Sequence, residues 1–244
     1  MILLLSATPQ ELAPFLNHPE VTQGASLAIG GRLVTECRFH EKSLLALATG
    51  PGAVNTAMGL AALLETREIS RIMQIGCAGG FGRAKVRTGD VAIATEEIDV
   101  HLGLEREEDP QSVSPLPFSV MEKEGKAYRN RYLLNREMAD KASEVLHQSS
   151  IAPKKGFSLH KGSFISASTI TTTTTRANTL FELYCPVMES MEGAAAAHTA
   201  IHYNTPLLEI RAASNLVGPR NRESWELASA FNNSCLCLIE LLKK

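Results

Sequence analysis

The chain lacks an apolar run long enough to span a bilayer. Its opening, "MILLLSATPQEL", has four apolar residues after Met1 and no basic flank, which is also too short for a secretory signal. The pattern gives no indication of a membrane partner. It favours a buried first strand.

Neither sign of charge is in clear excess. The 24 Lys and Arg residues against 26 Asp and Glu residues leave a formal net charge of −2. Such a balance offers no electrostatic basis for binding nucleic acid or an anionic membrane. We therefore expect neither nucleic acid nor a membrane as a partner.

Metal and disulfide patterns are missing as well. The five cysteines show no CxxC spacing, and the seven histidines form no HExxH motif. We expect reduced thiols in a cytoplasmic protein, and no metal. No GxxxxGKS phosphate loop occurs either.

Short apolar runs alternate with segments of helical periodicity along the whole chain. This alternation predicts a single domain, residues 1–244, of the α/β class: a three-layer α/β/α sandwich with a mixed, largely parallel central sheet. Residues 24–42 differ and predict an antiparallel meander around Gly30 and Gly31. The expected strands are 2–5, 43–50, 71–79, 90–98, 162–169, 185–191 and 206–214, and the expected helices are 53–68, 131–148, 193–204 and 225–244.

The segment 103–130 is polar, contains three prolines and has little periodicity. Such a segment is either a surface loop or a lid over a binding site. The sequence leaves both readings open.

Two glutamates, Glu189 and Glu192, precede a run of small apolar residues in "MESMEGAAAAH". A buried carboxylate needs a cation, backbone amides or ligand hydroxyls as partners. Glycine-rich or polar ends follow several predicted strands, as in "ATGPGAVN" (48–55) and "GCAGGFG" (76–82). Ligands of open α/β sheets bind at such ends, although each cluster alone also suits an ordinary turn.

Together these motifs resemble the purine nucleoside phosphorylase and nucleosidase superfamily. "MEGAAAAH" (191–198) followed by "RAASN" (211–215) is similar to the methylthioadenosine/S-adenosylhomocysteine nucleosidase pattern, as are "GCAGG" (76–80) and "SATPQEL" (6–12). The extension "SNLVGPRNRESW" (214–225) is closer to the futalosine hydrolase branch. The resemblance spans nearly the whole chain.

The resemblance implies a catalytic set. Glu192 would accept hydrogen bonds from the ribose hydroxyls and favour an oxocarbenium-like ring, with Met191 on the sugar face. Glu11 would activate water as a base, and Arg211 would hold that water and pair with Glu11. The structural alternatives are helix-terminal roles for both glutamates. Glu189, three residues before Glu192, is either a partner that supports the site residues or a surface carboxylate.

Asn215 stands where the methylthioadenosine enzyme has an aspartate. An amide cannot transfer a proton, but its NH₂ can donate to the adjacent N7 and O6 acceptors of a 6-oxopurine. Asn215, oriented by Ser214, therefore favours hypoxanthine over adenine as the leaving base. A turn or N-cap role is the alternative.

The remaining candidates bind substrate. The resemblance implies main-chain contacts to the base and ribose from residues 77–79, and contacts to the base from residues 169–171, which also suit an ordinary strand. Arg220 and His101 are candidates for a carboxyphenyl ketone on the 5′ side, although arginines in polar loops are commonly solvated. The full substrate-binding set is Cys77, Ala78, Gly79, Thr169, Ile170, Thr171, Met191, Ser214, Arg220 and His101.

The resemblance thus implies hydrolysis of futalosine to hypoxanthine and dehypoxanthine futalosine, in the alternative menaquinone route. It implies a homo-oligomer of two or more copies, without metal or organic cofactor. The alternatives are an adenine-releasing nucleosidase, a phosphate-dependent phosphorylase and a non-catalytic nucleoside sensor.

Overall fold

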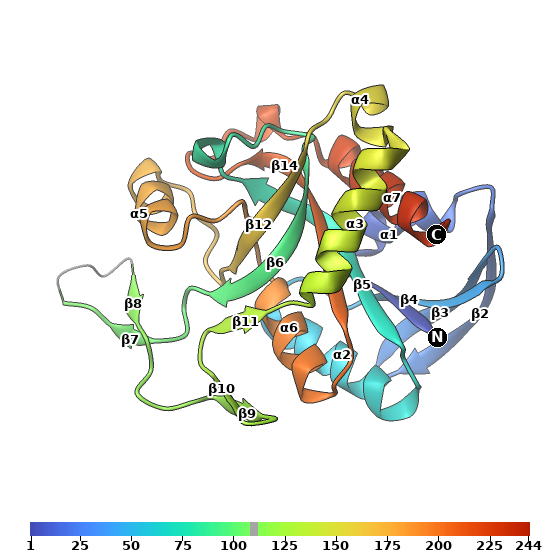
Figure 1. The fold of residues 1–244 in the computed structure, drawn as a ribbon, viewed down its shortest axis with the longest axis horizontal. Coiled ribbons are helices and arrows are strands. Elements are labelled where there is room, and N and C mark those ends of the chain that lie inside the picture. The colour runs from blue at the N-terminus through green and yellow to red at the C-terminus, as the bar shows by residue number, and fades with distance from the viewer. Residues whose placement is uncertain (108–111) are drawn as a thin grey trace.

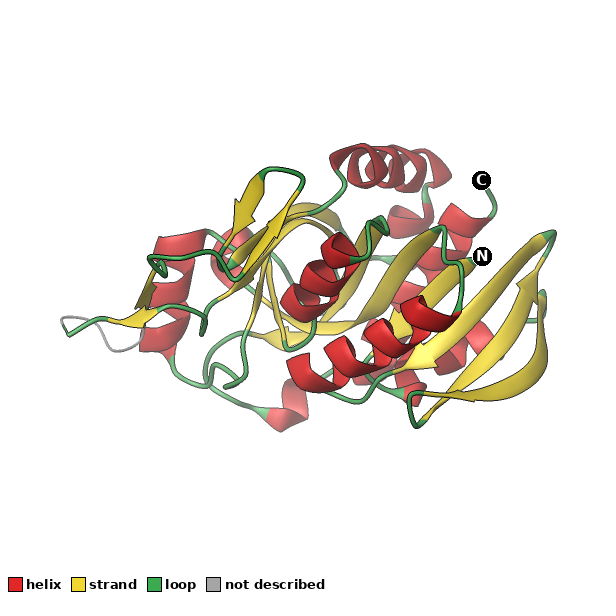
Figure 2. Cartoon of the chain, turned by 90° about the horizontal axis from the view of Figure 1, so that it is seen from below, coloured by secondary structure: helices red, strands yellow, loops and turns green. Residues whose placement is uncertain are grey.

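The computed structural model describes residues 1–107 and 112–244. One mixed sheet runs through the molecule, and helices cover it on both sides (Figures 1 and 2). The α helices are α1 (Pro9–Leu16), α2 (Ala53–Thr66), α3 (Arg136–Ser149), α4 (Ile151–Lys155), α5 (Thr174–Tyr184), α6 (Gly193–His202) and α7 (Leu227–Leu242). The strands of the main sheet are β1 (Ile2–Ser6), β2 (Val21–Ile29), β3 (Arg32–Phe39), β4 (Lys42–Ala48), β5 (Arg71–Gly80), β6 (Val91–Asp99), β11 (Arg131–Leu133), β12 (Leu159–Ser166), β13 (Met188–Ser190) and β14 (Leu207–Leu216).

The main sheet closes on itself in one half. Its order is β11-β6-β12-β13-β5-β1-β4-β3-β2, and β14 pairs with both β5 and β6. The strands β6, β12, β13, β5 and β14 therefore form a ring. β14 is parallel to β5 but antiparallel to β6, so parallel and antiparallel pairs meet in one sheet. The expected α/β class with a mixed central sheet is confirmed.

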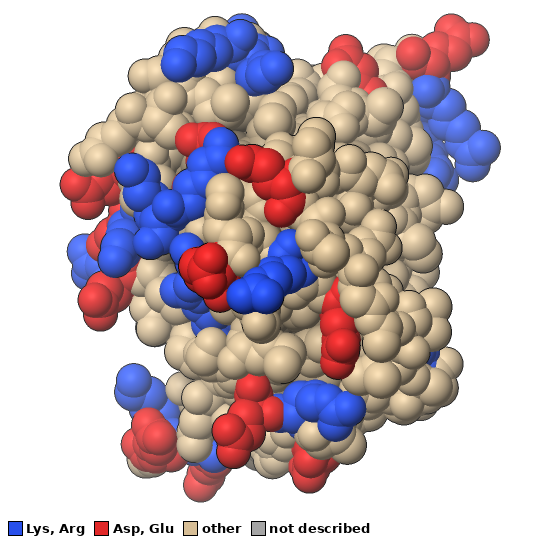
Figure 3. Space-filling model, turned by 90° about the vertical axis from the view of Figure 1, so that its right-hand side faces the viewer, with Lys and Arg blue, Asp and Glu red and all other residues tan. Residues whose placement is uncertain are grey.

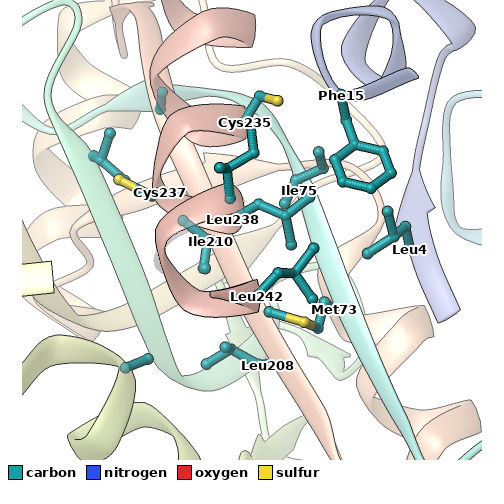
Figure 4. Close-up of a cluster of buried hydrophobic side chains, with 14 of the residues drawn as sticks. Leu4, Phe15, Met73, Ile75, Leu208, Ile210, Cys235, Cys237, Leu238 and Leu242 are labelled. Carbon is teal, nitrogen blue, oxygen red and sulfur yellow. The ribbon is translucent and has the colours of Figure 1, made fainter. Parts of the chain in front are cut away.

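Continuous apolar strands form because both of their faces are covered. All residues of β1 are buried, and β1 lies parallel between β4 and β5. On one face α7 packs its apolar side chains, including Leu238 and Leu242, against residues of β5 and β14 such as Ile75 and Ile210 (Figure 4). This packing fixes the strands whose ends form the site.

The sequence located most elements. The predicted meander is the antiparallel β2–β3–β4 unit. The predicted helix 131–148 was wrong at its start, because residues 131–133 form β11 and pair with β6. Helix α5 was not expected; it begins after Thr173, whose side chain accepts from the amide of Arg176.

The polar segment 103–130 contains two short hairpins. They pair β7 (Leu104–Glu105) with β8 (Val113–Ser114), and β9 (Met121–Lys123) with β10 (Lys126–Tyr128). Residues 108–111 of this segment lie outside the described residues.

On the face shown in Figure 3, basic and acidic side chains are interspersed with neutral surface. No helix in the described part of the chain is both long and apolar enough to cross a membrane.

Candidate active site

A cavity of about 520 Å³ opens where β1, β5, β13 and β14 end. Its walls come from segments far apart in the sequence. The residues that line it are Ala7, Thr8, Gln10, Glu11, Pro51, Cys77, Ala78, Gly79, Ile170, Thr171, Glu189, Ser190, Met191, Glu192, Arg211, Ser214, Asn215, Val217, Trp225, Leu227 and Phe231.

Glu192 stands at the N-cap position of α6 and is only 5% exposed. Its Oε1 accepts from the amide of Gly52 at 2.9 Å, and its Oε2 accepts from Arg211 Nη2 at 3.3 Å. A carboxylate offers about four acceptor positions, so Glu192 can still accept from a ligand hydroxyl. The carboxylate is thus held rigidly at the cavity wall.

Arg211 is 1% exposed and uses its guanidinium in three directions. Nε donates to Glu209 Oε1 at 2.9 Å, Nη2 reaches Glu192, and Nη1 donates to the carbonyl of Cys77 at 3.2 Å. Burial alone would lower the pKa of Arg211. The carboxylates of Glu209, Glu192 and Glu11 outweigh this effect and raise the pKa above its ordinary value, so the side chain stays charged. The expected ion pair with Glu11 was wrong: the carboxylates in direct contact are Glu209 and Glu192.

Glu11 takes part in the N-terminal cap of α1 and also lines the cavity. Its Oε2 accepts from the amide of Thr8 at 2.8 Å and so completes a capping box at the start of α1. Its Oε1 accepts from the amide of Cys77 at 2.9 Å. Glu11 therefore caps the first turn of α1 and also lies in the cavity wall.

Gly76 brings β5 against this pair. A Cβ at this position would lie 3.0 Å from Arg211 Nη1 and closer still to Glu11. A glycine here allows the strand backbone to approach both side chains.

Ser214 orients Asn215. The Ser214 hydroxyl donates to Asn215 Oδ1 at 2.9 Å, and Asn215 Nδ2 donates to the carbonyl of Leu216 at 3.0 Å. Among the described residues none accepts the second N–H of this amide, which is therefore available to an acceptor in the cavity.

Glu189 also lines the cavity, on the side of Thr171. It accepts from the Thr171 amide at 3.0 Å and from the Thr171 hydroxyl at 2.5 Å. Burial raises the pKa of Glu189, and the two hydrogen bonds from Thr171 oppose that rise. Ile170 beside it is 43% exposed.

Residues 77–79 line the cavity along the end of β5. Burial raises the pKa of the Cys77 thiol to about 12. The thiol therefore stays protonated and is not a nucleophile at neutral pH.

Three expected residues lie outside the cavity lining. Thr169 is exposed. His101 accepts from the amide of Ser168 at 2.9 Å, and burial and the nearby Arg176 lower its pKa. Arg220 lies 4.7 Å above the ring of Trp225, which does line the cavity.

Sequence reasoning missed an apolar wall. Trp225, Leu227 and Phe231 come from the start of α7 and the residues before it. The apolar spacing of "WELASAF" was visible, but it was assigned to helix packing alone. Glu209, the main partner of Arg211, was also missed inside an apolar strand.

In the described part of the chain, no group of three His, Cys, Asp or Glu side chains could hold a metal ion. His198 and His202 are four residues apart on α6, but His198 Nδ1 lies 3.1 Å from the Tyr132 hydroxyl. No metal chemistry is assigned to them.

The family model described as the phosphorylase superfamily matches residues 1–243, and the chain belongs to this superfamily. The sequence-based expectation of an enzyme acting on N-glycosidic bonds is thereby confirmed. The resemblance to the nucleosidase and futalosine hydrolase branch is confirmed by the relatives described next.

Relatives of two kinds match at comparable identity. A futalosine hydrolase of Thermus thermophilus is 28% identical over 232 residues, which cover 95% of this chain and 91% of the relative. A futalosine hydrolase of Streptomyces coelicolor is 30% identical, with 77% and 73% covered. A 5'-methylthioadenosine/S-adenosylhomocysteine nucleosidase of Oceanobacillus iheyensis is 26% identical, with 99% and 98% covered.

Solved structures support the fold. The native futalosine hydrolase of Helicobacter pylori superimposes with a TM-score of 0.84 at 18% identity, covering 99% of this chain and 97% of that one. The 5'-methylthioadenosine/S-adenosylhomocysteine nucleosidase of the same organism, with butyl-thio-DADMe-Immucillin-A, gives 0.84 at 17% identity and the same coverage.

Proposed function

We propose that the chain hydrolyses the N-glycosidic bond of futalosine, releasing hypoxanthine and dehypoxanthine futalosine for menaquinone synthesis. The observation that carries the proposal is the convergence of Glu11, Glu192, Arg211 and Asn215 on one cavity. Relatives named futalosine hydrolase support the substrate class.

In this proposal Glu192 accepts hydrogen bonds from the ribose diol. Its negative charge, held in place by Gly52 and Arg211, favours the positive character that the ribosyl ring gains as the C1′–N9 bond breaks. The cavity excludes most solvent from this carboxylate, which strengthens the effect.

Glu11 takes a proton from the attacking water, and the water oxygen bonds to C1′. The electron pair of the broken bond leaves with the base, which takes a proton from solvent, and Glu11 returns its proton to solvent. The free N–H of Asn215 donates to the departing 6-oxopurine, whose N7 and O6 are both acceptors. Arg211 donates to the backbone carbonyl of Cys77 and to Glu192, and in this proposal it holds both groups in position beside the attacking water.

Substrate contacts follow the cavity walls. Residues 77–79 supply main-chain contacts, Met191 packs on the sugar, and Ile170 with Thr171 flanks the base. The apolar wall around Trp225 suits the phenyl ring of the 5′ substituent. In this proposal Arg220, whose guanidinium lies over the ring of Trp225, pairs with the carboxylate of that substituent.

A second candidate is methylthioadenosine/S-adenosylhomocysteine nucleosidase activity, which the relative of Oceanobacillus iheyensis supports over almost the full chain. Asn215 favours hypoxanthine over adenine because an amide NH₂ suits the adjacent N7 and O6 acceptors of a 6-oxopurine, whereas adenine has a donor beside N7. A phosphorylase is disfavoured: Arg211, the cation of the cavity lining, is already paired with two carboxylates.

We further propose that residues 1–244 act as one domain and that the protein is a cytoplasmic homo-oligomer. The family match over residues 1–243 supports the first point. The cysteines, free throughout the described residues, agree with a reducing compartment.

The test is a substrate panel. The protein is incubated with futalosine, inosine and methylthioadenosine, with and without phosphate, and the released base is identified by chromatography. We expect hypoxanthine from futalosine without phosphate. Preferential adenine release or strict phosphate dependence contradicts the proposal. Glu11→Gln should lose turnover, whereas Glu20→Gln, on an exposed side chain, should not.

A further inference from the structure

Two more glutamates lie behind Arg211, outside the cavity lining. Glu97 comes from β6 and Glu209 from β14, and both side chains are 0% exposed. Glu209 Oε1 accepts from Arg211 Nε at 2.9 Å. The reaction proposed above uses neither carboxyl group directly.

Each of these carboxyl groups has one oxygen with an ordinary donor. Glu97 Oε2 accepts from the Ser166 hydroxyl at 2.7 Å, and Glu209 Oε1 accepts from Arg211. The other two oxygens, Glu97 Oε1 and Glu209 Oε2, have no donor within residues 1–107 and 112–244. Both face Gly193: a Cβ there would lie 2.7 Å from Glu209 Oε2 and closer to Glu97 Oε1.

The two unpaired oxygens thus converge on the same point beside Gly193, where a proton on one carboxyl group can be donated to the other. Two ionised carboxylates in this contact would repel, and each would leave a buried acceptor unsatisfied. One shared proton converts Glu97 Oε1 into a donor and satisfies both oxygens.

The surroundings of Glu97 favour the protonated form. Burial raises the pKa of Glu97, and the carboxylate of Glu209 raises it further. The Ser166 hydroxyl and Arg211 lower the pKa of Glu97. Arg211, however, donates its Nε–H to Glu209 and not to Glu97. Gly193 of α6 faces both carboxyl groups, and it has neither a side chain nor a charge.

We infer that Glu97 is a protonated positioning residue that donates to Glu209, so that the pair presents one negative charge to Arg211 and holds its guanidinium against Glu192. An ionised Glu97 would add a second charge behind Arg211. That charge would draw the guanidinium toward β6 and away from its 3.3 Å contact with Glu192. The kinetic part of this inference rests on the proposed function.

The proton itself can be observed without substrate. Infrared difference spectra at neutral pH should show a protonated-carboxyl C=O band in the wild type that Glu97→Gln removes and that shifts in deuterium oxide. Glu189→Gln, at another buried glutamate, should leave this band in place. If the Glu97→Gln spectrum keeps every protonated-carboxyl band of the wild type, the inference is wrong.

Kinetics test the positioning. In Glu97→Gln the amide N–H can donate to Glu209 and the amide oxygen can accept from Ser166, as the protonated acid does. We expect its kcat to stay within about threefold of the wild type, and Glu97→Met, which cannot donate, to lose about 100-fold through displacement of Arg211.

Thermal unfolding shows whether each variant is folded. The positioning role is contradicted if Glu97→Gln is as slow as Glu97→Met. It is also contradicted if both variants are as active as the wild type. If the wild type hydrolyses no nucleoside, the proposed function fails, while the infrared result still decides the state of Glu97.

Discussion

Replacing Glu192 with Gln removes the negative charge at the cavity wall while keeping the side-chain length. If the charge stabilises a ribosyl cation, kcat should fall about 100- to 1000-fold, the size of losing one preorganised electrostatic partner, or about 2.7–4 kcal/mol. KM should change less, because an amide oxygen still accepts a hydrogen bond from a hydroxyl.

The structure also sets the stability cost of Glu192→Gln. Gly52 and Arg211 both donate to this carboxylate, so the amide must turn its NH₂ toward one of them. One buried donor loses its acceptor, which costs about 1–3 kcal/mol. Arg211 keeps Glu209, so the fold should survive.

The assay for Glu192→Gln is single-turnover base release from futalosine, together with urea unfolding. Glu182→Gln, on an exposed side chain paired with Arg83, is the control and should match the wild type in both. A folded Glu192→Gln variant with an unchanged kcat would refute the electrostatic role.

Three further predictions concern the same region. Asn215→Asp should shift the ratio of adenine to hypoxanthine release in a competition assay by about tenfold or more, since a carboxyl can bind and protonate N7; an unchanged ratio argues against base selection by this side chain. Glu97 has a pKa raised above its ordinary 4.5, so above that pH the native state keeps a proton that the unfolded state releases. Wild-type stability should then fall relative to Glu97→Gln by about 1.4 kcal/mol per pH unit, up to the raised pKa, in urea unfolding from acid to neutral pH; parallel curves contradict the shift. Gly76→Ala should cost about 1–3 kcal/mol by overpacking and abolish turnover, because the added carbon meets Glu11 and Arg211. Gly82→Ala, whose Cβ would lie 3.8 Å from its nearest neighbour, is the matched control in thermal unfolding.

Much of the fold follows from local pattern. Apolar strands alternating with helical periodicity predicted the α/β class, because strands covered on both faces must be apolar throughout, as Ile2–Ser6 is. Helix α5 was missed because its threonine-rich start has no apolar periodicity, and it is placed by packing of Leu180 against its neighbours.

The sequence by itself determined which chemical groups are available at the strand ends: a carboxylate at Glu192, an arginine at Arg211 and an amide at Asn215. The tertiary structure alone decided their partners. Because β14 lies between β5 and β6, which are both far from it in the sequence, Glu209 meets Glu97, and Arg211 meets Glu192 rather than Glu11. Periodicity reports which face of a strand is buried, but only the strand order of the closed sheet determines which buried charges come into contact.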